Sequence, residues 1–569
     1  MKKWLLFLLC LLALLAFFLR RYVLALVFRL PLPRYRVRVA SGLRIPTRDS
    51  LTLAADHYYP HTAERFPTVL IRSPYGRNVQ AGVFGFLLAF FAHRFAERGY
   101  HVLVQDTRGR FDSDGEFEPY FPERADGLAT LDWLQQQPWF NGVVGTWGPS
   151  YLGIVQWVIA DSPLIKALVP SVTAARLYDI VFPDGAFDLG MALRWMALFR
   201  VLDRHKNAPL PLVPVWGALM LPQAELMIRP ALRALPVIDD DIVTTKQRVS
   251  FYHTWLQHAR PDDPLWQETL DAVDMNRVYA PVQFIGGWHD FFLRALLRDY
   301  QTLRAAGHRP HLIIGPWHHF SHMFTLFDSL EPGLRWFDTY LKGQNRLRKK
   351  PVRIYVMGAR QWRELPDYPP PSTPLRFYLS GDQRLARQPA DAPPDQYTYD
   401  PATPTPAVGG TQFYLFGGAR NNRPLLRRRD VLRYTSQRLS APLEIIGAVT
   451  LELYVKSSLP YTDFFGRLCD LYPDGRTINV CDGLFRIEPG KGQCQPDGSL
   501  RIEIDLWSTA YRFRKGHRIR LLVASGAHPR WARNLGSDDQ IMSASFAAAQ
   551  QTVFHDIAHP SALVLPLVN

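Results

Sequence analysis

Short apolar runs rich in β-branched residues alternate with longer amphipathic stretches over the first two thirds of the chain. Helical patterns at 127–137, 151–160 and 291–306 lie between these runs. The runs occupy residues 68–71, 102–105, 143–147, 167–172, 282–286 and 311–314. Continuous apolar strands alternating with helices are typical of a parallel sheet covered on both faces. The pattern therefore predicts an α/β domain over residues 31–350.

Two stretches depart from this alternation. Residues 175–275 are rich in Trp, Leu and Arg with a mostly helical pattern, which predicts a helical cap over the carboxyl edge of the sheet. Proline-rich segments at 368–374 and 389–406 precede short alternating segments at 449–455, 501–505 and 518–523. Few helices are expected there, so residues 351–569 are predicted to form an all-β jelly-roll sandwich.

The first thirty residues are expected to lie outside the core of the folded domains. Lys2 and Lys3 precede an apolar run at 4–19, and Arg20 and Arg21 follow it. Sixteen apolar residues can span a bilayer when flanking arginines snorkel, and no small-residue cleavage site is evident. We expect residues 1–30 to be an uncleaved membrane anchor; the alternative is a signal peptide and a secreted protein. Positive charge flanks the apolar run at both ends, so charge does not set the orientation of the anchor in the membrane. We expect the rest of the protein to lie on the extracytoplasmic side.

The composition and net charge of the chain limit the kinds of binding partner. The chain has 569 residues, 47% of them hydrophobic, and a net charge of +15. A basic total suits nucleic acid or an anionic membrane surface, but no nucleic-acid motif accompanies it. The basic runs at 346–350 and 427–429 are interpreted as solvated or membrane-facing.

The four cysteines do not suggest a metal site. Cys10 lies in the apolar N-terminal run, and Cys469, Cys481 and Cys494 lie in one late stretch without a CxxC pair. Zinc is therefore not expected. Two alternatives remain for the last three cysteines: two of them form a disulfide, or all three are reduced thiols in a domain core.

Three sequence motifs place reactive side chains at the ends of predicted strands. GTWGPSYLG, residues 145–153, places Ser150 on a turn between a predicted strand and helix. GGWHDFF lies at the end of the predicted strand at 282–286 and contains Asp290. GPWHHFSH lies at the end of the predicted strand at 311–314 and contains His319. Ser, Asp and His at three strand ends, in that order, predict a nucleophile, an orienting acid and a general base.

Other roles for the histidines remain open. His318 competes with His319 for the role of base. Together with His289 and His322 the pair could be interpreted as a metal cluster, but no carboxylate-bearing helix motif accompanies it. No metal or cofactor is therefore expected.

These motifs resemble those of the cocaine-esterase and X-Pro dipeptidyl-peptidase family of serine hydrolases. GPSYLG, GGWHDFF and GPWHH carry the resemblance, and segments such as IRSPYGR, DTRGRFDSDGEF and GHRIRLLVASGAHPRWARN extend it from about residue 36 to 535. The family accepts Leu152 where the general pattern wants glycine. The resemblance implies Ser150 as nucleophile, Asp290 and His319 as its partners, and an oxyanion hole from the Tyr75 hydroxyl and the Tyr151 backbone N–H.

The substrate is expected to be a small ester or amide with a moderately apolar acyl group. Apolar Phe291, Phe292 and Leu293 follow Asp290, where α-amino-acid ester hydrolases of the family carry acidic residues. An X-Pro dipeptidyl-peptidase or an α-amino-acid ester hydrolase remains the alternative, with Asp184 or the acidic run at 239–241 as the amine site. A membrane-anchored binding protein with a degenerate hydrolase domain is the more distant one.

Overall fold

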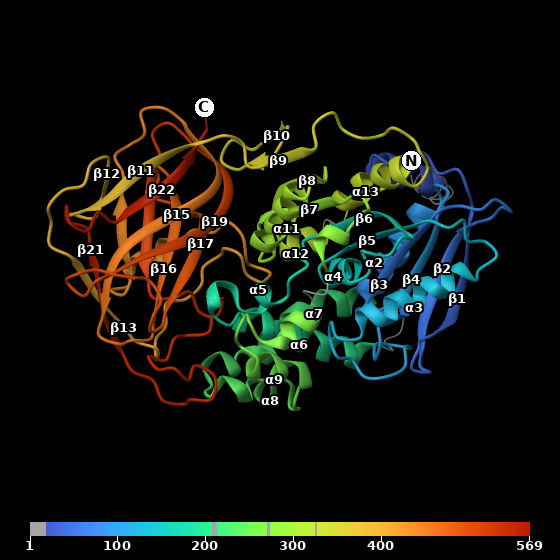
Figure 1. Ribbon diagram of the computed structural model, residues 1–569, viewed down its shortest axis with the longest axis horizontal. Helices are drawn as coiled ribbons and strands as arrows, with labels where there is room; N and C mark the ends of the chain where they lie inside the picture. Colours follow the sequence, from blue (N-terminus) through green and yellow to red (C-terminus); the bar gives the residue numbers. More distant parts are fainter. Residues whose placement is uncertain (1–18, 207–212, 270–272, 325–326, 569) are drawn as a thin grey trace, which may run out of the picture.

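The computed structural model describes residues 19–206, 213–269, 273–324 and 327–568. Figure 1 shows an α/β part, coloured blue to yellow, beside a β part in orange and red. The α/β-hydrolase domain and the all-β C-terminal domain predicted from the sequence are both confirmed.

Ten strands of the described chain form the sheet of the α/β part, in the order β1-β2-β4-β3-β5-β6-β7-β8-β9-β10. The central strands β3 to β8 run parallel, and β3, β4, β5 and β7 are buried along their whole length. The strands are β1 (Val37–Pro46), β2 (Thr52–Pro60), β3 (Thr68–Ser73), β4 (His101–Asp106), β5 (Val144–Pro149), β6 (Ile165–Ser171), β7 (Gln283–His289), β8 (His311–His318), β9 (Val352–Val356) and β10 (Gln361–Leu365).

Helices cover both faces of this sheet, as continuous apolar strands require. They are α2 (Val83–Ala96), α3 (Glu123–Gln135), α4 (Tyr151–Trp157), α11 (Leu293–Ala305), α12 (His319–Phe324) and α13 (Phe327–Tyr340). The carboxyl ends of β5, β7 and β8 lie at the same edge of the sheet. Ser150, Asp290 and His319 each follow the last residue of one of these strands, so the three residues lie close together.

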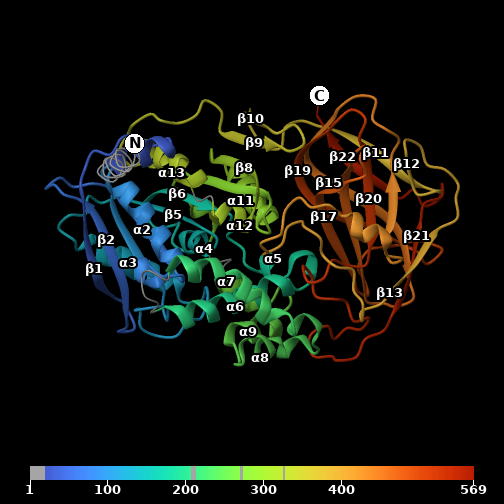
Figure 2. The ribbon, with the colours of Figure 1, turned by 180° about the vertical axis from the view of Figure 1, so that it is seen from behind.

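The chain between β6 and β7 forms the helices of the cap. These are α5 (Tyr178–Val181), α6 (Leu189–His205), α7 (Val213–Ile228), α8 (Asp240–Thr245), α9 (Ser250–Gln257) and α10 (Pro264–Thr269). Figure 2 shows α6 and α7 beneath the carboxyl edge of the sheet and beside the β domain. Residues on every side of α6 are buried, and its apolar side chains belong to the main hydrophobic core.

The second domain is built almost entirely of strands. Its described strands pair in the order β13-β21-β15-β22-β11-β12-β14-β20-β16-β17, and β19 joins β15 from outside this path. They are β11 (Thr373–Ser380), β12 (Arg384–Ala386), β13 (Asp395–Tyr399), β14 (Leu432–Thr435), β15 (Leu443–Ser457), β16 (Thr462–Leu471), β17 (Thr477–Ile487), β18 (Gln493–Cys494), β19 (Leu500–Phe513), β20 (Arg518–Ala524), β21 (Ala549–Phe554) and β22 (Ala562–Leu567).

The sheet of the α/β part extends beyond residue 350, the boundary expected from the sequence. β9 pairs with β8, and β10 pairs with β9, so the hydrolase sheet continues to Leu365. The alternating burial of β9 suits a strand of either domain, and its pairing with β8 and β10 decides its place.

Part of the predicted anchor lies on the enzyme. Residues 1–18 are outside the described residues, but residues 19–27 form a helix, and Phe28, directly after it, packs against Phe90 of α2. Ala25 and Leu30 are buried, and Arg21 pairs with Glu97 at 2.8 Å. The expectation that all thirty residues stay clear of the core is therefore corrected for residues 19–30. Among the described residues we find no helix with the length and apolar character needed to cross a bilayer.

The three late cysteines are free thiols. Cys469 and Cys481 are buried in β16 and β17, and Cys494 is exposed in β18. Burial raises the pKa of the Cys469 thiol to about 12, so this side chain behaves as a small apolar group of the β-domain core.

Candidate active site

Ser150 sits at a strained turn between β5 and α4. Its backbone has φ 57° and ψ −125°, a conformation that few non-glycine residues adopt. Its N–H donates to the Ser171 carbonyl at 2.8 Å, and its own carbonyl accepts the first helical bond, from Gly153. A side chain at Gly153 would lie 2.3 Å from Thr173, so the close helix packing requires glycine there. The turn thus projects the serine hydroxyl from the sheet edge.

His319 joins Ser150 to Asp290. Its Nε2 lies 3.1 Å from Ser150 Oγ, and its Nδ1 lies 2.8 Å from Asp290 Oδ2. Asp290 Oδ1 accepts the backbone N–H of Phe292 at 2.8 Å, which fixes the carboxylate. Both His319 and Asp290 are buried. This geometry lets the imidazole take the serine proton while the carboxylate stabilises the resulting charge.

Aromatic rings fix the plane of the imidazole. Phe291 and Phe292 lie 4.6 and 5.7 Å from the His319 ring, and Phe413 of the β domain lies 5.4 Å from it. The residues after Asp290 therefore form an apolar wall around the histidine, as their composition suggested.

Two hydrogen-bond donors lie beside the serine. The Tyr75 hydroxyl lies near the Ser150 side chain and accepts the indole N–H of Trp195 at 3.0 Å. Burial raises the pKa of Tyr75 to about 12, so its proton is retained at neutral pH. The backbone N–H of Tyr151 begins α4, where helix N–H groups lack intrahelical partners.

The side chain of Tyr151 has a separate task. Its hydroxyl donates to Glu123 Oε1 at 2.6 Å and accepts the backbone N–H of Tyr120. Arg72 holds the same glutamate at 2.7 Å, and all three side chains are buried. This network anchors the start of α4 and leaves the Tyr151 N–H as the group available to a substrate.

The other histidines lie outside the serine–histidine–aspartate chain. His318 faces the β-domain loop, since a side chain at Gly418 would lie 3.2 Å from its ring. Burial lowers the pKa of His318, His289 and His322 to about 4 in each case. Within the described part of the chain, no three His, Cys, Asp or Glu side chains are grouped closely enough to hold a metal ion.

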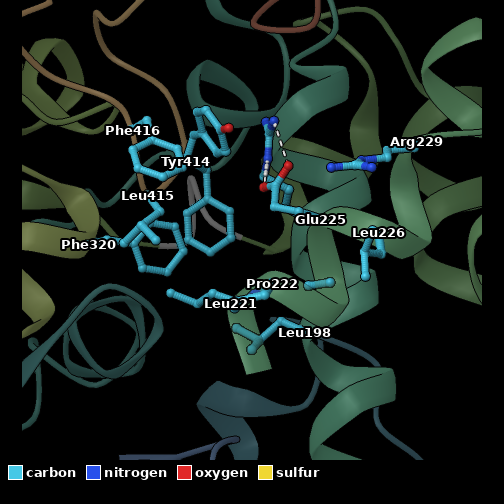
Figure 3. Close-up of a pocket in the computed structure, with 13 residues that line it drawn as sticks. Leu198, Leu221, Pro222, Glu225, Leu226, Arg229, Phe320, Tyr414, Leu415 and Phe416 are labelled. Carbon is cyan, nitrogen blue, oxygen red and sulfur yellow. Dashed lines mark hydrogen bonds and ion pairs between the residues drawn. The ribbon is translucent and has the colours of Figure 1, made fainter. Parts of the chain in front are cut away.

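A cavity of about 330 Å³ lies between the cap and the β domain, and two of its lining residues, Phe320 and Phe413, contact the His319 ring. Figure 3 shows Phe320, the neighbour of His319, at one side and residues of α7 at the other. Its wall is largely apolar, with one carboxylate, Glu225, held by Arg194. The lining residues are Arg194, Leu198, Leu221, Pro222, Ala224, Glu225, Leu226, Arg229, Phe320, Phe413, Tyr414, Leu415 and Phe416.

The sequence analysis missed two residues of the site. Trp195 comes from α6 in the cap, and Phe413 comes from a β-domain loop. Neither belongs to a local motif. The length of the insertion at 175–275 was the one signal that the cap covers the site.

Comparison with known proteins gives matches to both domains. Residues 49–321 match the X-Pro dipeptidyl-peptidase (S15 family) model, and residues 345–564 match the model of the X-Pro dipeptidyl-peptidase C-terminal non-catalytic domain. The chain is 32% identical to a cocaine esterase from Rhodococcus sp. (strain MB1 Bresler), over 93% of this chain and 99% of the relative.

Solved structures share the fold across both domains. An α-amino acid ester hydrolase has a TM-score of 0.77 at 23% identity, covering 94% of this chain and 97% of its own. An aminopeptidase from a marine sediment Thaumarchaeota archaeon has a TM-score of 0.76 at 22% identity, covering 94% and 96%.

Proposed function

The chain belongs to the X-Pro dipeptidyl-peptidase (S15) family of serine hydrolases, and from this premise we propose the roles of its site residues. Ser150 is the nucleophile, His319 the general base and Asp290 its orienting partner. The observation that carries the proposal is the unbroken chain from Ser150 Oγ through both imidazole nitrogens to the Asp290 carboxylate. A degenerate hydrolase domain would not keep this chain of contacts.

The reaction follows from the geometry. His319 Nε2 takes the Ser150 proton as Oγ attacks the substrate carbonyl carbon. The oxyanion that forms accepts hydrogen bonds from the Tyr75 hydroxyl and the Tyr151 N–H. His319 then gives its proton to the leaving alcohol, which departs and leaves the acyl group on Ser150. Water attacks this acyl-enzyme as His319 takes its proton. The bond between the acyl carbon and Ser150 Oγ then breaks, His319 returns the proton to Oγ, and the acid leaves.

We propose an ester with an apolar acyl group as the substrate. An ammonium group needs a free carboxylate near the serine, but Glu225 is paired with Arg194. Of the acidic residues that the sequence offered, Asp184 pairs with Arg294, and Asp241 accepts from His253 at 3.0 Å. Burial raises the pKa of Asp240 to about 8, so this carboxyl is mostly protonated at neutral pH and does not attract an ammonium group. These pairs support an esterase over an X-Pro dipeptidyl-peptidase.

Parallel assays test this choice of substrate. The enzyme and its Ser150→Ala variant are incubated with short p-nitrophenyl esters and with an X-Pro p-nitroanilide. We expect ester hydrolysis that disappears in the variant and no release of p-nitroaniline. Cleavage of the X-Pro substrate would contradict the ester proposal and point to an amine site.

We also propose that residues 1–18 anchor the enzyme to a membrane, with its domains on the extracytoplasmic side. Their sequence, MKKWLLFLLCLLALLAFF, and the arginines that follow support the proposal. Cell fractionation of the full chain and of a chain lacking residues 1–18 tests it. The full chain is expected in the membrane fraction and the shortened one in the supernatant; equal distribution would contradict an anchor.

A further inference from the structure

Three helices carry an apolar surface made of separate exposed patches: the N-terminal helix, α2, and α7 beside the cavity. Large side chains on the helix of residues 19–27 face solvent, with Leu26 72% and Val27 64% exposed. Phe28, directly after this helix, packs edge-on against Phe90 of α2 at 5.8 Å. Figure 2 shows this helix, α2 and α7 on one side of the molecule.

Helix α2 carries the second of these patches. Val83, Phe86 and Phe90 share one face of α2, because their spacing is three and four residues. Phe90 contacts the N-terminal segment, and Val83 lies against Gly217 of α7. Phe86, between these two contacts, is 50% exposed.

Helix α7 carries its own exposed stripe at the mouth of the cavity, on the side of the helix opposite Gly217, because residues 219, 222 and 226 lie about 140–200° round the helix from residue 217. Leu219, Pro222 and Leu226 form a second stripe with the same spacing, and all three are exposed. Pro222 and Leu226 also line the cavity. Across the mouth stands Phe416 of the β domain, which is 55% exposed (Figure 3).

Positive charge accompanies the apolar side chains at the mouth. Arg229 lines the cavity, and Arg420 lies over the Phe416 ring, with 5.7 Å to its centroid. Both are exposed, and neither forms an ion pair with a residue that the structure describes. Exposed apolar groups beside unneutralised arginines suit the surface of an anionic bilayer.

From these contacts we infer that the mouth of the cavity docks on an anionic lipid bilayer and takes long-chain acyl esters directly from it. The chain outside the described structure supports a lipid occupant, since 18 mostly apolar residues precede Leu19 at one end of this surface. The apolar cavity beside His319 is suited to an acyl chain. The inference rests on the proposed esterase function and names its substrate class.

The test compares two esters with the full-length enzyme. One is p-nitrophenyl palmitate in phosphatidylcholine vesicles, with and without phosphatidylglycerol; the other is p-nitrophenyl acetate in solution. We expect phosphatidylglycerol to raise the palmitate rate, and added salt to reverse this gain because it screens the arginines. No effect of phosphatidylglycerol would overturn the docking surface.

Variants locate the surface. Leu219→Asp lies on the exposed stripe of α7 outside the cavity, and its matched control, Ile557→Asp, changes an exposed residue of the β domain. We expect Leu219→Asp to lower the ratio of palmitate to acetate rates about tenfold, from the lost transfer of a leucine side chain into lipid. Ile557→Asp should leave the ratio unchanged. Phe86→Asp repeats the test on α2 if Leu219→Asp does not fold.

The remaining outcomes are distinct. Equal ratios in Leu219→Asp, Phe86→Asp and the control would overturn the inference. A dimer that Leu219→Asp converts to a monomer, with the ratio unchanged, would assign the surface to contacts between copies and overturn it as well. An enzyme that hydrolyses neither ester would instead contradict the proposed function.

Discussion

At the residue scale, Tyr75 has the most specific assignment outside the triad. Its hydroxyl lies between Ser150 and the Trp195 indole, and it stays protonated because burial raises its pKa to about 12. A donor of this kind stabilises the developing oxyanion by about 2.7–4 kcal/mol. Tyr75→Phe should therefore lower kcat by about 10²–10³ with KM little changed.

Steady-state kinetics on a short p-nitrophenyl ester measures this effect. Tyr279→Phe, at an exposed position, is the matched control and should behave as the unmodified enzyme. An unchanged kcat in Tyr75→Phe would remove this tyrosine from the oxyanion hole.

Alanine variants of the neighbouring residues His318 and His319 should differ in kcat in the same ester assay. His319→Ala removes the group that bridges Ser150 and Asp290, so kcat should fall by about 10⁴ or more. His318→Ala removes a ring that faces Gly418, and most of the rate should remain. The reverse order would assign the general base to His318.

At the element scale, the packing of α4 against the chain after β6 sets the serine turn. Gly153→Ala would place a methyl carbon 2.3 Å from Thr173, so α4 has to shift. We expect a loss of about 1–3 kcal/mol in stability and a lower kcat, because the Tyr151 N–H moves with the helix. Thermal unfolding and ester kinetics check both effects.

Gly381→Ala provides the comparison for Gly153→Ala. Its nearest neighbour would be Ala392 at 3.2 Å, in the β domain. This variant should keep its rate. Equal rates and equal Tm values for the two variants would show that the packing of α4 does not control the turn.

Elements with strong local patterns were predictable from sequence. The apolar runs that became β5, β7 and β8 place Ser150, Asp290 and His319, since the carboxyl ends of parallel strands share an edge. The contact of Phe413 with His319 was not predictable, because it joins two domains and no periodicity encodes it. Strand β9 is similar: its alternating pattern fits either domain.

At the scale of the whole molecule, the β domain completes the site and is bonded to the cap. Gly190 N–H donates to the Pro529 carbonyl at 2.7 Å, and the Trp531 indole donates to the Pro183 carbonyl at 3.1 Å. Arg530 lies 3.1 Å from Asp188, with both side chains buried. These bonds hold the loop of Phe413 against the catalytic histidine.

The Arg530–Asp188 pair makes stability depend on pH. Burial raises the pKa of Asp188 to about 6, although Arg530 lowers it. A folded-state pKa above the ordinary value means that stability falls as pH rises through it. Arg530→Ala raises that pKa further, so the loss of stability should be larger at about pH 8 than at about pH 5. At the higher pH we expect about 3–5 kcal/mol, the usual result of unpairing a buried charge.

Thermal unfolding at the two pH values measures this difference. Arg476→Ala, which removes an exposed pair with Asp474, should leave Tm nearly unchanged at both. An equal loss at both pH values in Arg530→Ala would mean that Asp188 does not titrate as its burial implies.

The central claim is that Ser150 is a nucleophile activated by His319. Reaction of the intact enzyme with a fluorophosphonate, followed by mass spectrometry of its peptides, tests it most directly. The account predicts one adduct, on Ser150, that is lost in Ser150→Ala and forms far more slowly in His319→Ala. A Ser150 that stays unlabelled, or labelling that persists at full rate in His319→Ala, would contradict it.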